Sequence, residues 1–447
     1  MIQGLKSWFA DRTFRIAFDH RSILDSYKLP WKIRKIQEKT REFADREIRP
    51  RALQYDAKTP DQFDWEIVRI GAREGFLGIF LPTKFGGSLS YPLLRYGILA
   101  TAVMMEELCR ACSGIGLIFG AHGLGIAPIF LSLDRRLWNK YFTPLSETWE
   151  DEKPKLAAFA ITEPGAGSDA EDDIGAKKAK MTSFAEKVDG GWLLNGRKCF
   201  ISNGGQASLF TVFAATDRDN PAFSWTCFVV HAGQKGFSVG RLENKMGQRA
   251  SSAAELYFED VFVGDEDVIG SVKGGWQLNR LTLDTSRAAV GAIALGITQG
   301  AFDHTIKYCM EESRGGKNLI EEGWVKQELA EMAAKIEAAR GLVYQASAAL
   351  PANGKLSAMA KSFASDVGME VCSKCIQLLG SAGIERQYFV EKHFRDIKLC
   401  QIYEGTNQIN RLRIMEDLEM EYSGRPEPYG LYDSYKTDIA KWQKTIV

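Results

Sequence analysis

The chain has 447 residues, of which 45% are hydrophobic and 26% are charged, and its 57 basic residues balance its 57 acidic ones. This length is too great for one hydrophobic core, so about two to four domains are expected. The zero net charge gives no indication of a nucleic-acid or membrane-surface partner.

Residues 1–32 are expected to form an extension ahead of the first domain. Arg12 and Arg15 lie in an amphipathic pattern that a mitochondrial presequence would share, but three aspartates in the segment argue against that interpretation. The segment lacks the apolar stretch of a secretory signal, and no run approaches the roughly 20 apolar residues of a membrane span. We therefore expect a cytoplasmic protein, or a matrix protein if the source has mitochondria, with no membrane span.

The eight cysteines are scattered along the chain, which suits a reducing compartment. Two Cys-x-x-Cys pairs, Cys109/Cys112 and Cys372/Cys375, lie in apolar helical surroundings without histidine at ligand spacing. Such surroundings favour buried structural thiols over a zinc site.

The hydrophobic period changes twice along the chain. Helical spacing begins at Trp31 and predicts an N-terminal helical domain over residues 33–150. Short alternating runs predict a middle β-domain, barrel- or sandwich-like, over residues 151–268. The helical period returns over residues 269–420, which predicts a C-terminal four-helix bundle, and residues 421–447 form a tail without clear period. The predicted class is α+β.

One hairpin is predicted inside the β-domain. The apolar runs at 192–194 and 198–201 flank Asn195-Gly196, a dipeptide that supplies the two positive φ angles of a type I′ turn.

The first candidate motif is the loop that follows the apolar run at Phe159. It reads Thr-Glu-Pro-Gly-Ala-Gly-Ser-Asp over residues 162–169. Glycines let backbone N–H groups approach a phosphate closely, and Ser168 adds a hydroxyl. No Gly-Lys-Ser/Thr follows, so the loop is not a nucleotide P-loop. On its own, the loop favours a plain turn capped by Asp169 over a phosphate-binding loop.

The second candidate motif is Lys-Cys-Phe-Ile-Ser-Asn-Gly over residues 198–204. Phe200 and Ser202 stand two apart, so on a strand they would share one face. A flavin requires such a pair, because a ring can lie against it and a hydroxyl can donate to its reactive edge. Ordinary strand packing ahead of an Asn-Gly turn remains the alternative.

The third candidate motif is Gln-Ile-Tyr-Glu-Gly-Thr-Asn-Gln, which begins at Gln401. Glu404 stands among apolar residues beside Tyr403, so desolvation should raise the pKa of its carboxyl toward the working pH of a general base. The alternative is a helix N-terminus capped by Thr406, and the two roles are compatible.

Together, in this order and with the helical–β–helical layout, the three motifs resemble the acyl-CoA dehydrogenase family over about residues 33–415. Further matching pieces are Glu47–Pro50, Gly78-Ile79, Glu106–Leu108, Met246–Arg249, Phe258–Val261 and Gln377–Gly383. The resemblance implies FAD as cofactor, an acyl-CoA thioester as substrate, an electron-transferring flavoprotein as electron acceptor, and a homodimer or homotetramer.

The resemblance also implies roles for individual residues. Glu404 corresponds to the catalytic base, because the alternative position for the base, on the helix around Asp284, is occupied here by Ser286. Residues implied to contact the cofactor are Ile161, Thr162, Gly167, Ser168, Phe200, Ser202, Arg314, Gln377, Gly380, Ser381, Thr406 and Gln408. Residues implied to contact the substrate are Ser168, Asp284, Arg287, Tyr403 and Gly405.

Three positions depart from the family pattern. Phe200 replaces the usual tryptophan, Ser381 replaces a glycine, and the family's Arg-x-x-Phe-Gly becomes Glu-Ser-Arg-Gly-Gly at residues 312–316, where Arg314 could supply the charge. An acyl-CoA oxidase that uses oxygen, or a non-catalytic relative that acts as a scaffold, are the rival interpretations.

The segment from Ser113 to His122 should line the far end of the acyl cavity, by the same resemblance. Each of its glycines at 114, 116 and 120 costs about 1 kcal/mol in a helix. Two explanations stay open: close helix packing, or room for a bulky apolar acyl group.

Overall fold

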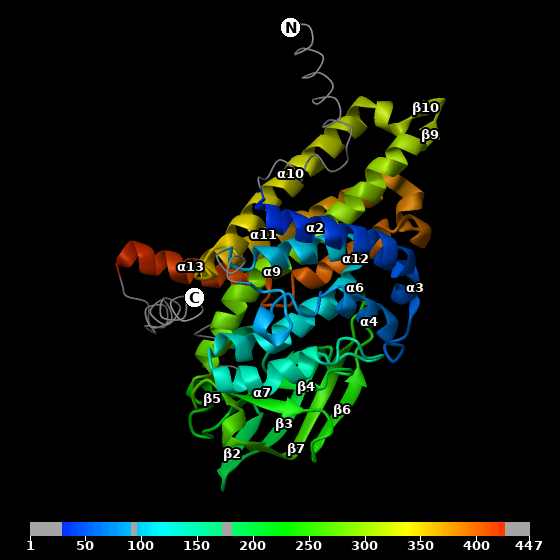
Figure 1. Cartoon of the computed structure of the whole chain (residues 1–447). Coiled ribbons are helices and arrows are strands. Elements are labelled where there is room, and N and C mark those ends of the chain that lie inside the picture. Colours follow the sequence, from blue (N-terminus) through cyan, green and yellow to red (C-terminus); the bar gives the residue numbers. More distant parts are fainter. Residues whose placement is uncertain (1–28, 91–95, 172–180, 425–447) are drawn as a thin grey trace, which may run out of the picture.

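The computed structural model describes residues 29–90, 96–171 and 181–424, except the side chains of residues 171 and 314. Most of the predicted extension (residues 1–32) and tail (residues 421–447) lies outside the described residues, namely residues 1–28 and 425–447. A mixed β-sheet lies at one end of the molecule and a bundle of long helices at the other (Figure 1). The fold is α+β with helical, β and helical regions in chain order, as predicted.

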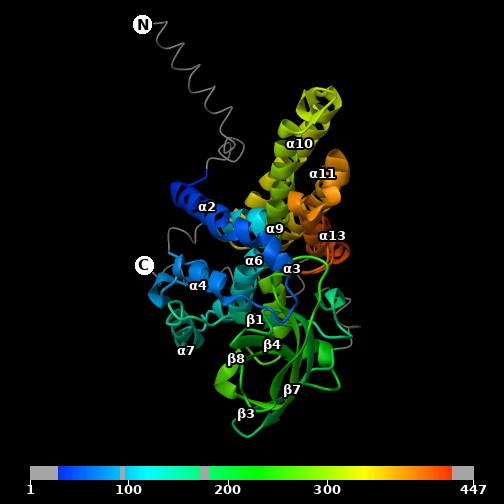
Figure 2. The same cartoon turned by 90° about the vertical axis from the view of Figure 1, so that its right-hand side faces the viewer.

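The N-terminal region is helical. Its main helices are α2 (Trp31–Phe43), α3 (Ala52–Ala57), α4 (Trp65–Arg73), α6 (Leu99–Leu131) and α7 (Arg135–Ser146). α6 is mainly apolar and is buried over most of its surface, because it is the central helix, in contact with α2, with the sheet and with α9 of the C-terminal region. Figure 2 shows α2 and α4 on one side of α6 and α9, with α11 and α13 on the other.

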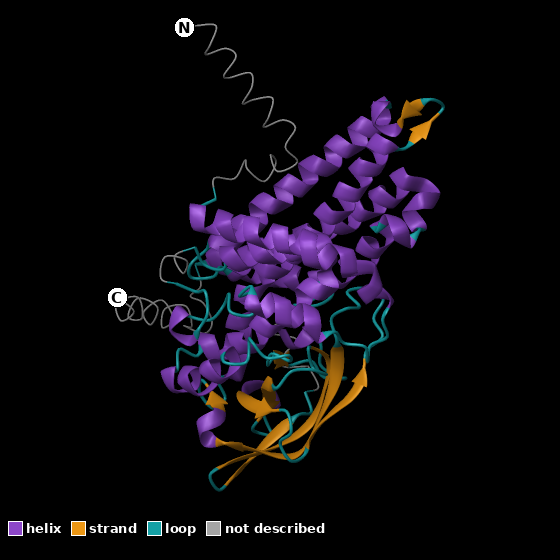
Figure 3. Cartoon of the chain, turned by 45° about the vertical axis from the view of Figure 1, so that its right-hand side comes forward, coloured by secondary structure: helices purple, strands orange, loops and turns teal. Residues whose placement is uncertain are grey.

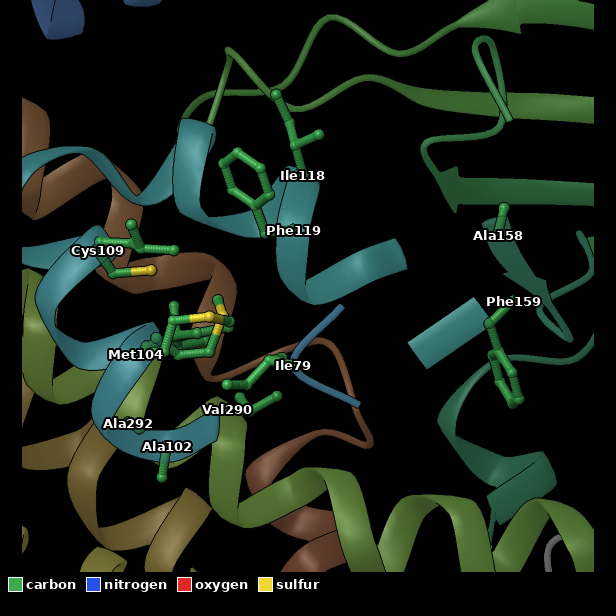
Figure 4. Close-up of a cluster of buried hydrophobic side chains, with 14 of the residues drawn as sticks. Ile79, Ala102, Met104, Cys109, Ile118, Phe119, Ala158, Phe159, Val290 and Ala292 are labelled. Carbon is green, nitrogen blue, oxygen red and sulfur yellow. The ribbon is translucent and has the colours of Figure 1, made fainter. Parts of the chain in front are cut away.

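α6 consists of two helical halves joined at Cys112, where the backbone is extended (φ −161°, ψ 109°). The second half turns back beside the first, so that Phe119 lies near Met104 and Cys109, with Val290 of α9 facing them (Figure 4). Most of α6 is therefore covered by protein.

α6 corrects one expectation from the sequence. Among the described helices, it alone is long and apolar enough to cross a membrane, although no such run was predicted. Protein buries 72% of its most apolar stretch, which is typical of the core helix of a folded domain.

The middle region is an eight-stranded mixed sheet, drawn in orange below the helices in Figure 3. Its strands run in the order β6-β7-β3-β2-β4-β5-β8, and β1 pairs with β4 in parallel. The bounds are β1 (Ala157–Ala160), β2 (Phe184–Val188), β3 (Gly191–Ser202), β4 (Leu209–Ala215), β5 (Trp225–His231), β6 (Phe237–Leu242), β7 (Ala253–Gly264) and β8 (Val268–Ile269).

The predicted hairpin at Asn195-Gly196 is wrong. β3 runs unbroken through both residues, and the turn that reverses the chain is the preceding one, at Gly190 (φ 71°) between β2 and β3. Gly196 (φ 146°) marks a β-bulge against β7, and Asn195 exchanges hydrogen bonds with Asp260 across that bulge. A left-handed glycine signalled irregular backbone here, but not a chain reversal.

The C-terminal region is a bundle of antiparallel helices whose far tip carries the small hairpin β9–β10 (Figure 1). The bounds are α9 (Gly275–Glu311), β9 (Ser313–Arg314), β10 (Lys317–Asn318), α10 (Gly323–Ala348), α11 (Gly354–Leu379), α12 (Val390–Cys400) and α13 (Asn407–Ser423). The contacts of α6 with β1 and of α9 with α6 bring the sheet and the bundle together around the loops described next.

Candidate active site

The structure brings the three sequence motifs together at the junction of sheet and bundle. The backbone N–H of Cys199, in the second motif, donates to the carbonyl of Thr162 in the first (3.0 Å). The backbone N–H of Thr406, in the third motif, donates to Ser168 Oγ (3.1 Å). Segments more than 200 residues apart in sequence thus form one site.

A buried ion pair holds the first motif against β3. Lys198 Nζ lies 2.7 Å from Glu163 Oε1, both side chains are fully buried, and the same ammonium donates to the carbonyl of Ile161 (2.9 Å). The backbone N–H groups of Thr182 and Ser183 also donate to the Glu163 carboxylate. Burial alone would raise the pKa of Glu163, but Lys198 and these donors hold that pKa below its usual range.

Glu404 is the strongest candidate for chemistry. Protein surrounds its carboxyl group, although the residue as a whole keeps some exposure to solvent. Burial raises the pKa of Glu404, and this confirms the expectation from its apolar neighbours. The hydrogen bond from Ser286 Oγ (2.6 Å to Oε1) and the positive charges of Arg287 and Lys361 offset the shift only in part.

The loop that carries Glu404 is strained and closely held. Glu404 has φ 55° and Gly405 φ 79°, so two successive residues adopt the left-handed conformation. Asn410 Nδ2 donates to the carbonyl of Gly405 (2.8 Å), and Thr406 caps α13 by accepting from the N–H of Ile409. The predicted helix cap is therefore confirmed, and it coexists with the buried carboxyl group.

Phe200 and Ser202 lie at the end of β3, where a second bulge against β7 falls between residues 198 and 201. Phe200 is 59% exposed and left-handed (φ 57°), and Ser202 is partly exposed. The bulge breaks the regular pleat on which the same-face prediction rested, yet Cys199 and Ile201 still point inward. An uncovered aromatic ring beside a hydroxyl fits a planar cofactor with a polar edge.

Tyr403 is oriented by partners from outside its own loop. Gln248 Nε2 donates to its hydroxyl (3.2 Å), and Cys400 Sγ lies 3.3 Å from the same oxygen. Burial raises the pKa of the Tyr403 phenol, so it stays neutral. Gln248 is itself left-handed (φ 51°) and held to α12 by its backbone N–H on the carboxylate of Asp396.

Asp284 and Arg287 lie on α9 behind Glu404. Asp284 is fully buried between Arg287 and Arg413, each 3.3 Å away. Burial would raise the pKa of Asp284, but these arginines outweigh it and lower that pKa. Arg287 Nε also donates to the carbonyl of Glu404 (3.4 Å). The pair therefore supports the Glu404 loop from the α9 side.

Four other predicted residues lie away from this junction. Gln377, Gly380 and Ser381 are exposed at the end of α11. Since a helix rises 1.5 Å per residue, Gln377 is about 24 Å along α11 from Lys361, whose Nζ contacts the Glu404 loop. Arg314 belongs to the hairpin at the tip of the bundle, and its side chain is outside the described part of the structure. Gln408, by contrast, lies two residues after Thr406 on the first turn of α13, next to the junction, and it is exposed.

At the three glycines of α6 named above, neighbouring atoms occupy the space that a side chain would need. A Cβ atom at Gly114 would lie 2.9 Å from the backbone nitrogen of Ala250, and one at Gly116 would lie 2.7 Å from Cys109 Sγ. At Gly120 the nearest atom is the methyl end of Met105, at 2.9 Å, which is flexible. Close packing therefore explains Gly114 and Gly116. At Gly120 the Met105 side chain could move, so room for a bulky acyl group stays open as an explanation there.

His122 belongs to the structure of α6 rather than to a ligand. Its Nδ1 accepts the backbone N–H of Ala157 in β1 (3.1 Å), and burial lowers its pKa to about 4. The eight cysteines are all buried, as the apolar surroundings of the two pairs indicated.

Sequence reasoning did not assign a role to Ser286, Lys361 or the Glu163–Lys198 pair. In the sequence, Ser286 stands out only as a position without an acid, although its place one residue before Arg287 is a usable signal. Lys361 gave no local signal, since a lysine in an alanine-rich helix is typical of a solvated face.

Three family models match the chain in series. The acyl-CoA dehydrogenase N-terminal domain matches residues 32–147, the middle domain matches residues 158–261, and the C-terminal domain matches residues 273–419. Together they cover most of the 447 residues.

Individual relatives agree with these matches. Cyclohexane-1-carbonyl-CoA dehydrogenase of Geobacter metallireducens is 36% identical over 392 residues, which cover 87% of this chain and 98% of the relative. The short-chain specific acyl-CoA dehydrogenase of Clostridium acetobutylicum is 35% identical over 384 residues, covering 85% and 96%. The structure of butyryl-CoA dehydrogenase from Megasphaera elsdenii superimposes with a TM-score of 0.81 at 32% identity, covering 88% and 99%. The chain therefore belongs to the acyl-CoA dehydrogenase family of FAD-binding oxidoreductases.

Proposed function

We propose that this protein removes hydrogen across the Cα–Cβ bond of an acyl-CoA thioester, giving the 2-enoyl-CoA, with Glu404 as the base. The observation that carries the proposal is the desolvated carboxyl of Glu404, with its raised pKa, at the meeting point of three loops. A base with a pKa lifted toward neutrality is suited to accept a proton from a weak carbon acid.

Glu404 takes the α-proton in this proposal. Its own backbone N–H donates to the thioester carbonyl and stabilises the negative charge that develops there. Bound FAD supplies, at flavin N5, the acceptor for the hydride that leaves the β-carbon. Tyr403 and Gly405 flank the reacting carbons in this proposal, and Gly405 is buried.

The residues present fit FAD at the junction. We propose that Phe200 covers the flavin ring, that Thr162 and Ser202 donate to its edge, and that Ile161 completes the apolar wall. Gly167 and Ser168 face the phosphates from the first motif. Among the described residues, the nearest atom to a Cβ added at Gly167 would be Asp169 Oδ1, at 3.9 Å, which leaves room for a ligand. Thr406 and Gln408 add polar contacts from the start of α13.

The residues at the end of α11 suit a cofactor held by a second copy of the chain. Gln377, Gly380 and Ser381 are exposed, and Gln377 is about 24 Å along α11 from Lys361, which supports a homodimer or homotetramer in which these residues reach the partner's FAD. Arg314 would act on the FAD pyrophosphate in the same way.

We infer that electrons leave the reduced flavin to an electron-transferring flavoprotein in the cytoplasm. An oxidase would instead pass them to oxygen. The two differ in one property, because the reduced oxidase reoxidises rapidly in air and a dehydrogenase does not.

The acyl group is expected to be apolar at its far end. From Ser113 to Ala121, α6 carries no charged residue that could hold a second carboxylate, and Phe119 is fully buried among apolar side chains. Among the relatives, one is named for a ring-bearing and one for a short-chain acyl group, which supports testing both classes.

The test is anaerobic bleaching of the purified yellow protein. Butyryl-CoA, octanoyl-CoA, cyclohexane-1-carbonyl-CoA and glutaryl-CoA are added in turn, and enoyl-CoA is identified by mass spectrometry. We expect bleaching with at least one apolar acyl-CoA and weak or no bleaching with glutaryl-CoA. If FAD is bound and no acyl-CoA bleaches it, the proposed reaction is wrong. Rapid reoxidation of the bleached protein by oxygen would point to an oxidase.

A further inference from the structure

The segment from Gln401 to Asn407, the base loop, is a closed unit that rests on α11. The N–H of Asn407 donates to the carbonyl of Gln401 (3.1 Å) and closes the loop. Both ends are attached to Asp366 on α11, since Gln401 Nε2 (2.6 Å) and Asn407 Nδ2 (2.7 Å) donate to its Oδ1. Glu404 and Gly405 are at the centre of this loop, in the left-handed conformation.

Lys361 reaches the centre of the base loop from the next turn of α11. Its Nζ lies 2.7 Å from the carbonyl of Gly405 and 2.9 Å from Asn407 Oδ1. The side chain is fully buried. Burying an ammonium group is costly unless its partners compensate, and a methionine or leucine would fill the same helical position without that cost. A charge retained here calls for a function.

Removing the Lys361 ammonium would leave the rest of the attachment in place. Asp366 still holds both ends of the base loop, and Asn410 still donates to the Gly405 carbonyl (2.8 Å). The middle of the loop would lose its charged donor. The expected change is therefore local to Glu404 and Gly405.

We propose that Lys361 is a positioning residue for the base: it fixes the Gly405 carbonyl, and with it the left-handed backbone of Glu404, and it places a buried positive charge that favours the ionised carboxylate. The inference rests on the proposed role of Glu404. It also agrees with the electrostatics, because burial raises the pKa of Glu404 and Ser286, Arg287 and Lys361 oppose that rise. Arg287 faces the base from α9 and Lys361 from α11.

The charge and the hydrogen bond are separated by three variants. Lys361→Met removes both, Lys361→Gln keeps a donor without charge, and Lys361→Arg keeps the charge. Each holoenzyme is reduced anaerobically by saturating butyryl-CoA, or by the best substrate of the panel, between pH 5 and pH 10. A misplaced base typically costs about 100-fold, so we expect Lys361→Met to reduce its flavin roughly 10- to 100-fold more slowly at pH 7.

The pH dependence gives the more specific readout. Glu404 acts as carboxylate, so a higher pKa moves the rise in rate to higher pH. We expect this upward shift in Lys361→Met and Lys361→Gln but not in Lys361→Arg. The infrared carboxylate band of Glu404 is identified as the band that is lost in Glu404→Gln. A pH titration of this band in each Lys361 variant should show the same upward shift, with no substrate turning over.

The control is Arg340→Met. Arg340 is also a fully buried cation, and it pairs with Glu106 of α6 (2.9 Å) and donates to Gln299 of α9 (2.7 Å), two partners outside the base loop. We expect it to lower the unfolding midpoint in urea while the Glu404 band titrates as in the unchanged protein. This separates a general loss of stability from an effect on the base.

The outcomes distinguish a failure of the positioning role of Lys361 from a failure of the proposed function. A folded Lys361→Met in which the Glu404 band titrates unchanged overturns the positioning role. If that variant does not fold, the comparison of Lys361→Gln with Lys361→Arg decides in the same way, and failure of all three to fold shows a structural role instead. If Glu404→Gln reduces its flavin at an unchanged rate, the proposed function is wrong. The infrared titration would still test whether Lys361 affects the pKa of Glu404.

Discussion

Four residues other than glycine adopt left-handed backbone close to the site: Phe200, Asn203, Gln248 and Glu404. Each such residue costs about 1–3 kcal/mol, so it persists only where surrounding contacts enforce it. Here those contacts are known: Asn203 Nδ2 donates to the carbonyl of Ile118 (2.9 Å), and Gln248 is held by Asp396. The strain lies in the segments that carry the base, the exposed ring and the Tyr403 partner.

Ser286 is expected to tune the base. Its Oγ donates to Glu404 Oε1 (2.6 Å), which favours the carboxylate and lowers a pKa that burial has raised. In Ser286→Ala the pKa of Glu404 should therefore rise, and the increase of flavin reduction rate with pH should move to higher pH. Thr285→Ala is the matched control, because Thr285 Oγ1 donates to the carbonyl of Leu281 in its own helix and not to the base. An identical pH profile in both variants would exclude this role for Ser286.

At the scale of elements, the buried Glu163–Lys198 pair joins the first motif to β3. Lys198→Met leaves a buried carboxylate without its partner, so we expect a loss of about 3–5 kcal/mol in the free energy of unfolding at pH 7. Lys198→Met combined with Glu163→Gln should lose less, because no buried charge is left unpaired. Urea unfolding of the apoproteins measures both losses. A loss in the double variant as large as that in Lys198→Met, or larger, would contradict this expectation.

The same pair predicts an acid-labile contribution to stability. The pKa of Glu163 is lowered in the folded state, so its contribution is present above the unfolded value of about 4.3 and is lost as pH falls through the folded pKa. We expect Lys198→Met to flatten the decline in stability over that acidic range. A decline of unchanged steepness would show that other carboxylates cause it.

Sequence patterns predicted the elements better than the contacts between them. The helical–β–helical order, the Thr406 cap and the desolvation of Glu404 follow from local periodicity and neighbours, and these are confirmed. The contact of Lys361 with Gly405 joins residues 44 positions apart, and nothing local marks it. α6 also breaks at Cys112. This residue is neither proline nor glycine, so its type does not signal the break.

The whole molecule is expected to work as an oligomer. The residues at the end of α11 are exposed and about 24 Å along that helix from Lys361, so we expect them to contact a cofactor that a second copy of the chain holds. Light scattering of the FAD-loaded protein should give the mass of a dimer or tetramer of the 49.9 kDa chain. Gln377→Ala should bind FAD more weakly while the unfolding midpoint of the apoprotein is unchanged. A monomer that retains FAD would contradict this assembly.

The central claim is that Glu404 is the base of an acyl-CoA dehydrogenation, and rapid mixing of the Glu404→Gln protein with its best acyl-CoA under anaerobic conditions tests it most directly. The variant should keep FAD and bind the acyl-CoA, since glutamine preserves the size of the side chain. Loss of a general base slows proton abstraction by roughly 10²–10⁴, so we predict flavin reduction slower by at least that factor. Flavin reduction at a rate close to that of the unchanged protein would contradict the account.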